Sequence, residues 1–375
     1  MRSYAVVAIA PEEHARRRDR LGELLEVREI DALFVPPSSD LEYLTGVERD
    51  LPSFGHLAYA HGWVAGAFFA PSREPLFVLP RMVVEFHLGG RSPEGSIVVG
   101  EDSDGRTLFG EAARSLGSPC RVALGARAWA QTVIELGGAL PGAELVEGSS
   151  LVNELRRVKS EAELELMARA CVLARETMEA SAQRVEPGVT MGELAEEVEH
   201  QLRVRGSRCP SFPTHIFTWG ERRLDSGDAS ASEPLAEGEA VLFDFGAVVG
   251  GYCSDFGRTV VCGETPTGYE EARHAMLAAQ EAGRAAAVPG ALARDVNAAC
   301  RAPIDDAGLG TGFRHRMGHG IGLDVHEGPF LSVEDETPLE TGMTFTDEPS
   351  ILVDGSFGVR VEDVIVVADG GARLL

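Results

Sequence analysis

Two aspartates inside an apolar β-hairpin place the strongest constraint on this chain. The stretch VLFDFGAVVGGYCSDFGRTVV, residues 241–261, has the pattern of two buried strands joined by a glycine turn, and it contains Asp244 and Asp255. Opposing residues of an antiparallel hairpin have numbers with a constant sum and face the same side. A turn at Val249-Gly250 places the two aspartates directly opposite each other, and a turn at Gly250-Gly251 places them diagonally on one face. Either register brings together two carboxylates that need a partner, because an uncompensated charge in a core is very costly.

A second hairpin near the C-terminus repeats this arrangement. In FTDEPSILVDGSFGVRVEDVIVV, a loop centred on Gly355 sets Glu348 opposite Glu362. Each hairpin follows two helical segments, and Pro187-Gly188 and Pro289-Gly290 interrupt the chain at matching places. Two helix–helix–hairpin units in the same order indicate an internal duplication.

The helical segments are marked by start signals and stop signals. Three Ser/Thr-x-x-Glu capping boxes are predicted, at Ser160/Glu163, Thr190/Glu193 and Thr267/Glu270. Residues 1–150 instead alternate between short helical and strand-like segments, which predicts a small α/β domain. The chain is too long for one ordinary core, so we expect an N-terminal α/β domain at 1–150 and a duplicated α+β domain at 151–375.

Four carboxylates that meet between the two halves cannot all stay ionised without cations. Hard divalent metals with oxygen ligands are the natural partners, and two ions suit four carboxylates better than one. His319, flanked by glycines in RMGHGIGLDVHEGP, offers a nitrogen ligand, and His326 follows it closely. A solvated strand face would explain a single acidic residue, but it does not explain this combination of paired spacings.

Composition and missing motifs exclude several other classes of protein. The net charge of −25 disfavours nucleic acids and anionic membranes as partners, and no apolar run approaches the length of a membrane helix. The six cysteines form no C-x-x-C pair, and Lys159 is the only lysine, so a phosphate-binding loop is absent. Neither H-E-x-x-H nor G-x-S-x-G occurs. Without a recognisable secretory signal, cytoplasmic residence is the expectation.

The motifs DFGAVVGGYCSDFGRT, GHGIGLDVHEGP, DEPSI and GVRVED resemble those of the pita-bread metallopeptidases. This family includes Xaa-Pro aminopeptidases, prolidases, methionine aminopeptidases and creatinase. YLTG at 43–46 and ELRRVKSEAELELM are similar to the prolidase and creatinase branch, so the resemblance covers nearly the whole chain. It implies a pita-bread catalytic domain after a creatinase-type N-terminal domain.

The resemblance also implies roles for individual residues. Asp255 and Glu362 would bridge two metal ions, Asp244 would chelate one, and His319 and Glu348 would bind the other. A water or hydroxide between the ions would attack the amide, with Glu348 as general base. His326 and Arg360 would stabilise the negative charge that develops.

One family feature is missing. Family peptidases usually carry a further histidine about seventeen residues before the first metal aspartate, and Gly227 stands there in this chain. His215 is a candidate substitute, although an ordinary strand histidine explains it equally well. Arg222, with Arg223 and Asp225, could instead bind a polar substrate.

Two histidines of the N-terminal domain, His56 and His61, are further candidates for substrate binding. In the prolidase branch this domain often reaches towards a catalytic pocket, sometimes across a dimer. An ordinary structural role is the competing explanation for each histidine.

Three functions are consistent with these patterns. The favoured one is a metallopeptidase that cleaves the bond before proline in short peptides. The alternative keeps the metal site but acts on a small non-peptide C–N compound or another metabolite, and the third is a non-catalytic binding protein. The ligand types favour Mn²⁺, with Co²⁺, Zn²⁺ or Fe²⁺ as alternatives, and the branch implies a homodimer.

Overall fold

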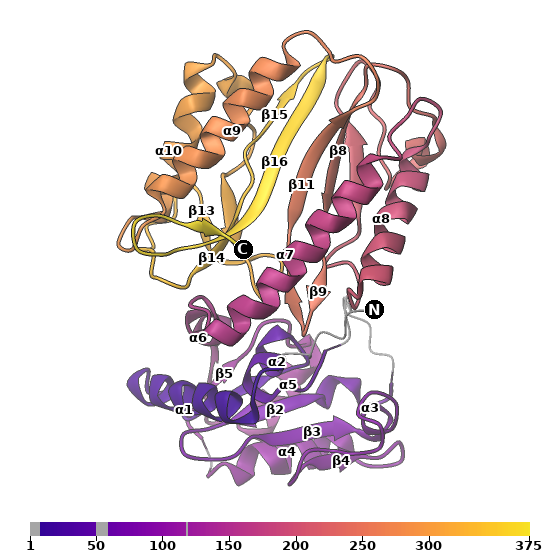
Figure 1. Cartoon of the computed structure of the whole chain (residues 1–375). Helices are drawn as coiled ribbons and strands as arrows, with labels where there is room; N and C mark the ends of the chain where they lie inside the picture. Colours follow the sequence, from indigo (N-terminus) through magenta and orange to yellow (C-terminus); the bar gives the residue numbers. More distant parts are fainter. Residues whose placement is uncertain (1–7, 50–58, 118) are drawn as a thin grey trace. The chain divides into compact units, whose positions relative to one another are not determined.

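A computed structural model describes residues 8–49, 59–117 and 119–375 of the chain (Figure 1). The chain divides into two compact units, Ile9–Arg156 and Arg157–Leu375. The division at Arg156 lies close to the boundary at 150 that the sequence analysis predicts. Each unit has its own sheet and its own hydrophobic core.

The N-terminal unit is a six-stranded mixed sheet with strand order β4-β3-β2-β1-β5-β6. Its aromatic core consists of Phe34, Phe68, Phe109 and Trp63, whose rings pack with centroid separations from 4.8 to 5.5 Å. The alternation of helices and strands predicted from the sequence is confirmed. The elements are α1 (Pro11–Val27), β1 (Ala32–Val35), α2 (Ser39–Thr45), β2 (Gly66–Phe69), β3 (Leu76–Pro80), α3 (Arg81–Phe86), β4 (Ile97–Val99), α4 (Gly105–Ser115), β5 (Arg121–Leu124), α5 (Ala130–Ala139), β6 (Glu144–Glu147) and α6 (Ser149–Arg156).

The C-terminal unit contains a nine-stranded sheet with the path β13-β12-β14-β16-β11-β8-β7, and β15 and β17 also pair with β16. Its first half comprises α7 (Glu161–Ala182), α8 (Met191–Arg205), β7 (His215–Thr218), β8 (Ala240–Phe245), β9 (Val248–Val249), β10 (Tyr252–Cys253) and β11 (Phe256–Val261). The second half comprises α9 (Tyr269–Ala286), α10 (Ala293–Asp306), β12 (Gly318–Gly320), β13 (Glu327–Leu331), β14 (Thr344–Asp347), β15 (Ser350–Val353), β16 (Phe357–Val366) and β17 (Arg373–Leu374).

The two halves repeat each other, as the sequence predicts. The helices α7 and α8 share one hydrophobic core with β7, β8 and β11. The helices α9 and α10 share a second core with β13 to β16. The pair α7 and α8 and the pair α9 and α10 therefore each cover their own half of the sheet (Figure 1).

Two of the three predicted capping boxes are confirmed. The side chain of Ser160 accepts a hydrogen bond from the Glu163 amide, Thr190 does the same with Glu193, and both glutamates bond back to the cap backbone. The prediction for Thr267 is wrong. Helix α9 starts one residue later than that box requires, because Gly268 takes the N-cap position at a φ of 84° without a side-chain cap bond.

The strand pairing in both hairpins follows the rule that the numbers of opposing residues have a constant sum. In the first, Val249 pairs with Tyr252 around Gly250-Gly251, and Asp244 pairs with Gly257. Of the two predicted registers, the diagonal one is therefore correct. Positive φ angles of 56° and 84° at Gly250 and Gly251 are those that the two-residue turn requires.

In the second hairpin, Asp347 pairs with Asp363 on one side and Ser350 with Arg360 on the other. This is the predicted register, and it places Glu348 level with Glu362, between the ends of β14 and β15. The loop that joins the strands contains Gly355 with a φ of 73°, as expected for a turn centred there.

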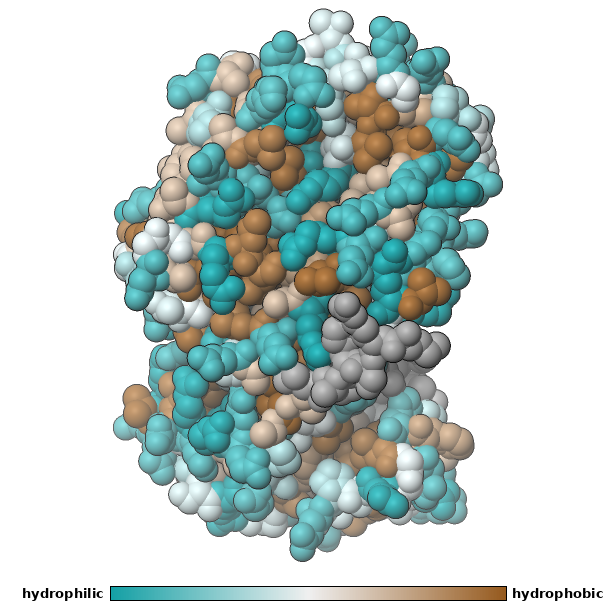
Figure 2. Space-filling model, in the orientation of Figure 1, coloured by the Kyte–Doolittle hydropathy of each residue, from teal (hydrophilic) through white to brown (hydrophobic). Residues whose placement is uncertain are grey.

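Hydrophilic side chains dominate the face of the C-terminal unit that carries α7, with smaller hydrophobic groups between them (Figure 2). Across the described ranges, no helix has the length and apolar character needed to cross a bilayer.

Gly246 directly follows β8 within the first hairpin, and it has no room for a side chain. A Cβ atom there would lie 1.8 Å from the Ser254 carbonyl oxygen and 2.1 Å from Ser211 Oγ. The Ser211 amide also donates to the Gly246 carbonyl at 3.0 Å. This close approach holds the two strands together between Asp244 and Asp255.

We expect Gly246→Ala to lower the melting temperature of the C-terminal unit by about 5 °C or more, because the clash is with backbone and costs about 1–3 kcal/mol or more. Calorimetry checks this, with Gly138→Ala as control: that glycine lies in α5 with nothing within 4 Å of the added Cβ. Equal melting temperatures for wild type and Gly246→Ala would show that the packing here is loose.

Candidate metal centre

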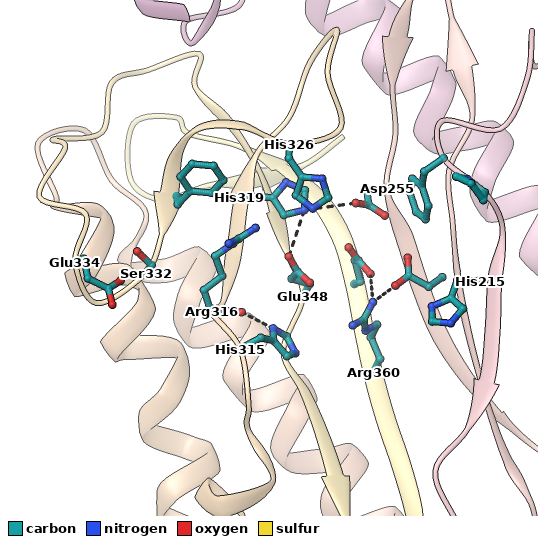
Figure 3. A pocket seen from close by; sticks show the side chains of 15 residues that line it. His215, Asp255, His315, Arg316, His319, His326, Ser332, Glu334, Glu348 and Arg360 are labelled. Atoms are coloured by element: carbon teal, nitrogen blue, oxygen red, sulfur yellow. Dashed lines mark hydrogen bonds and ion pairs between the residues drawn. The ribbon is translucent and has the colours of Figure 1, made fainter. Parts of the chain in front are cut away.

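A cavity of about 860 Å³ lies within the C-terminal unit (Figure 3). Carboxylates from both hairpins line it, together with histidines from β7, from β12 and from the loops before and after β12. The residues that line it and were predicted from the sequence are His215, Asp244, Asp255, His319, His326, Glu348, Arg360 and Glu362. The structure therefore brings together in one cavity every metal ligand that the resemblance implies.

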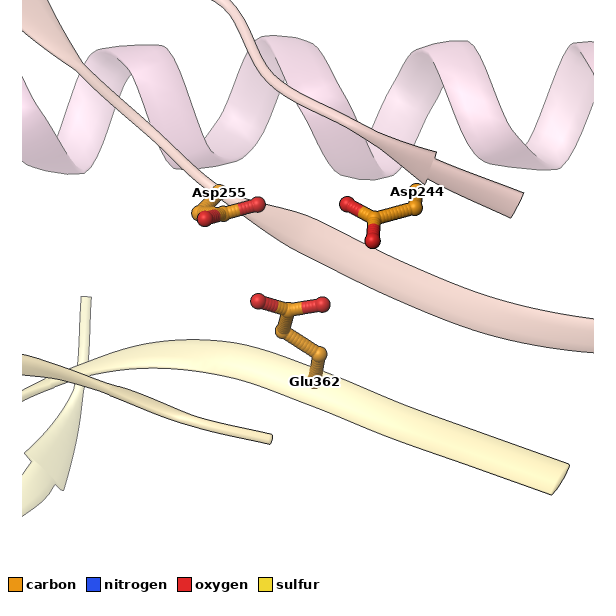
Figure 4. A group of neighbouring side chains, drawn as sticks. All are labelled: Asp244, Asp255 and Glu362. Atoms are coloured by element: carbon orange, nitrogen blue, oxygen red, sulfur yellow. The ribbon is translucent and has the colours of Figure 1, made fainter. Parts of the chain in front are cut away.

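The carboxylates of Asp244, Asp255 and Glu362 point toward one another (Figure 4). One oxygen from each lies within 4.8 Å of the others. Asp244 lies on β8, Asp255 directly before β11, and Glu362 on β16. Asp255 and Glu362 are 5% and 1% exposed, so these charges are almost completely withdrawn from water.

His319 and Glu348 complete the group from the second half of the domain. His319 Nε2 lies 3.4 Å from Glu348 Oε1 and 3.6 Å from Asp255 Oδ2. The His319 amide donates to Thr346 Oγ1 at 3.0 Å, and that hydroxyl donates to Glu348 Oε1 at 3.0 Å. His319 Nδ1 lies 3.1 Å from the Gly320 carbonyl oxygen, which suits a protonated Nδ1 and leaves Nε2 as the ligand atom.

Burial and like charge work against ionisation of four members of this group. Burial, then the charge of Asp244, raises the pKa of Asp255 well above its usual value. Burial, then the charge of Asp255, does the same to the pKa of Glu362. Burial also raises the pKa of Glu348 to about 7 and lowers that of His319 to about 3.

These residues fit a pair of hard divalent cations. A cation next to the carboxylates would offset both the burial and the mutual repulsion that raise their pKa values. Asp255 Oδ1 is buried without a hydrogen-bond partner in the described structure, and a metal ion would satisfy it. Four carboxylates and one neutral imidazole are a common donor set for such ions.

Arg360 and His326 flank the group of ligands. Arg360 Nη1 is hydrogen-bonded to Asp244 Oδ2 and lies 3.5 Å from Glu362 Oε2. The ring of His326 lies 3.9 Å from that of His319, centroid to centroid, and is tilted by 37°. Both side chains face the cavity next to the ligands (Figure 3).

His215, the candidate for the missing histidine, lies on β7 directly across from Asp244 and lines the cavity. Its Nε2 lies 2.8 Å from Asp225 Oδ2, and its ring stacks on Phe217 at 4.8 Å. The Gly227 amide donates to the other oxygen of Asp225 at 2.8 Å. Asp225 therefore orients His215.

Substrate binding by Arg222 stays a prediction, and the structure places this residue outside the cavity lining. Its guanidinium donates to the Pro234 carbonyl oxygen at 2.9 Å and lies 3.6 Å from the carboxylates of Glu233 and Glu239. Arg222 is thus held within its own loop and does not line the cavity. Arg223 likewise stacks on Trp219, with its carbon Cζ 3.7 Å from the ring centroid.

The two N-terminal histidines remain predictions. His61 belongs to the N-terminal unit, where its Nε2 lies 3.4 Å from the Glu101 carbonyl oxygen. His56 lies outside the described residues.

Sequence reasoning missed several residues that line the cavity, among them His315, Arg316 and Phe330. His315 Nδ1 lies 2.6 Å from the Arg316 carbonyl oxygen and Nε2 contacts Ser350 Oγ, and burial lowers the pKa of His315 to about 4. The sequence did contain a sign of these residues, because His315 and Arg316 closely precede His319 in the segment FRHRMGHG.

Comparisons with known proteins agree with this architecture. Residues 17–158 match the creatinase/prolidase N-terminal domain, and residues 165–369 match metallopeptidase family M24. The chain is 34% identical to the Xaa-Pro dipeptidase of Pyrococcus furiosus over 225 residues. This match covers 60% of this chain and 64% of that protein. The matched stretch thus spans just under two thirds of that relative.

Two solved structures are similar over nearly their whole length. The Xaa-Pro dipeptidase from Bacillus anthracis has a TM-score of 0.82 at 27% identity, covering 96% of this chain and 97% of its own. The dipeptidase from Pyrococcus horikoshii OT3 has a TM-score of 0.83 at 30% identity, with the same coverage. The resemblance stated from the sequence is confirmed: this chain belongs to metallopeptidase family M24, with a creatinase/prolidase N-terminal domain before a catalytic domain of pita-bread fold.

Proposed function

We propose that this chain is a two-metal peptidase that cleaves the bond before proline in short peptides. The observation that carries the proposal is the meeting of Asp244, Asp255, His319, Glu348 and Glu362 in one cavity. Relatives named Xaa-Pro dipeptidase support the choice of substrate.

The family resemblance implies a place for each ligand around two ions. Asp255 and Glu362, the most buried carboxylates of the cluster, would be shared by both ions. Asp244 would hold one ion, and His319 with Glu348 the other. Such ions lower the pKa of a bound water and polarise an amide carbonyl. An oxygen-rich set with one imidazole favours Mn²⁺, and Co²⁺, Zn²⁺ or Fe²⁺ are the alternatives.

The protein side chains supply the proton transfers and the charge stabilisation. Glu348 would take the proton of the attacking water and pass it to the leaving nitrogen, a role that suits a carboxylate fixed by Thr346. His326, next to His319, would donate to the oxygen on which negative charge develops. Arg360 would hold Asp244 and Glu362 in place and offset their charge.

An alternative substrate remains in view because Gly227 stands where the family usually has a histidine. The His215–Asp225 pair occupies this side of the cavity and would bind a substrate differently. A small non-peptide C–N compound is therefore the second candidate. The cytoplasmic location and the homodimer remain predictions from the sequence.

A substrate panel on protein stripped of metal and reloaded with Mn²⁺ tests the function. We expect release of proline from Xaa-Pro dipeptides only when metal is present, with little hydrolysis of matched Xaa-Ala dipeptides. The panel also contains longer Xaa-Pro peptides and small cyclic or guanidino amides. Activity confined to the non-peptide compounds would replace the first candidate with the second.

Metal binding is testable without any substrate. We expect two Mn²⁺ ions per wild-type chain, and Asp255→Asn should lose at least one ion or about 10-fold or more in affinity, because an amide bridges two cations poorly. Calorimetric titration and metal analysis measure this. Asp354→Asn, a change in the exposed loop of the second hairpin, is the control. Two ions bound to Asp255→Asn with wild-type affinity would contradict the bridging role.

The proposed base is tested by Glu348→Gln, which keeps the size of the side chain and one oxygen ligand but cannot accept the proton. We expect kcat to fall by about 100-fold or more. Metal analysis of the same sample separates loss of the base from loss of the ion. Hydrolysis at the wild-type rate with both ions present would exclude Glu348 as the base.

A further inference from the structure

Arg360 and Arg316 both line the cavity, and their guanidinium groups have different surroundings. Arg360 is paired with Asp244 and Glu362 and is therefore committed to the metal ligands. Across the described part of the chain, the guanidinium of Arg316 has no hydrogen bond or ion pair, and its Nε is buried without a partner. A cation left unpaired in a cavity indicates that a ligand supplies the anion.

Arg316 is held in place by apolar contact. Its carbon Cζ lies 4.6 Å from the centroid of the Phe330 ring, a cation–π contact. The Arg316 main chain is fixed as well, because its carbonyl oxygen lies 2.6 Å from His315 Nδ1. The side chain is therefore oriented before any ligand arrives, which lowers the entropic cost of binding.

Arg316 lies close to the metal centre. It precedes His319 by three residues in the loop that leads into β12. Its side chain extends into the cavity beside Glu348 and His319 (Figure 3).

The charges in the cavity favour an anionic substrate. Two divalent ions would balance the four ligand carboxylates, and the two charges of Arg360 and Arg316 then exceed the one charge of Glu334, which also lines the cavity. A guanidinium is suited to a carboxylate because its planar donors match the two carboxylate oxygens. In an Xaa-Pro dipeptide, three bonds separate the carboxylate carbon from the scissile carbonyl carbon, and the proline ring restricts the rotation between them.

We propose that Arg316 binds the free C-terminal carboxylate of the substrate and so selects dipeptides over longer or amidated peptides. This inference rests on the proposed function, since it names the part of the substrate that this cavity would recognise. The Nη groups would donate to the carboxylate, and the Phe330 ring would support the guanidinium.

The test compares Ala-Pro with Ala-Pro-amide in Mn²⁺-loaded wild type and Arg316→Met. For wild type we expect kcat/KM to be about 10- to 100-fold higher for the free acid, since a charge-assisted hydrogen bond is lost with the amide. In Arg316→Met we expect kcat/KM for the acid to fall by a similar factor, mainly through KM, with kcat/KM for the amide nearly unchanged. Arg316→Lys should recover part of the preference because it keeps the charge.

Arg314→Met is the matched control, because Arg314 is exposed two residues away and pairs with Asp354 outside the cavity. It should keep the wild-type preference for the acid. Melting temperature and metal content of each variant show whether folding or metal binding has changed.

Each contrary outcome has a separate meaning. Equal loss of activity on acid and amide in Arg316→Met would assign the residue a structural role and overturn the inference. Equal hydrolysis of acid and amide by wild type would also overturn it. If wild type hydrolyses neither, the proposed function fails, and calorimetric binding of proline against prolinamide decides the inference: equal affinities would refute it.

Discussion

The gathering of four like-charged carboxylates in one cavity is the constraint on which this structure depends. Asp255 and Glu362 are almost fully buried; in addition to burial, the charge of Asp244 raises the pKa of Asp255, and the charge of Asp255 raises the pKa of Glu362. One guanidinium, that of Arg360, lies against the group, but it pairs with only two of its members. A fold that gathers these charges gains stability only when cations enter, so metal binding and the stability of this region are linked.

The duplicated architecture makes this gathering possible because neither half holds a complete site. The two halves meet where β11 pairs with β16, with Gly257 opposite Glu362. A Cβ atom at Gly257 would lie 2.5 Å from Glu362 Oε2, so the absence of a side chain leaves room for the carboxylate. Arg258, the next residue, donates to the Glu362 carbonyl oxygen and forms two hydrogen bonds of 2.9 Å with Asp363. Where β11 pairs with β16, the face with Gly257 therefore has space for the Glu362 carboxylate, and the Arg258–Asp363 ion pair links the two strands.

The convergence of the carboxylates was predictable from the sequence because strands obey a strict period of two. Once glycines fix a turn, the numbering alone determines which residues share a face, and both registers follow it. The start of α9 was not predictable in the same way, since Gly268 competes with Thr267 for the N-cap position. Arg222 could not be placed either, because a long side chain in a loop follows whichever carboxylates the tertiary fold brings near it.

The contrast between strand residues and loop residues also separates the groups that would bind metal from those that would select the substrate. Asp244 and Glu362 lie on paired strands, where the backbone ladder fixes the direction of each side chain. The residues that face a substrate beyond the metals depend on loops: His215 is oriented by Asp225 from the loop around Gly227, and Arg316 extends from the loop before β12. Loops accept substitution without disturbing the strands. A chain of this family can therefore lose one histidine and present an arginine elsewhere while its metal ligands stay in place.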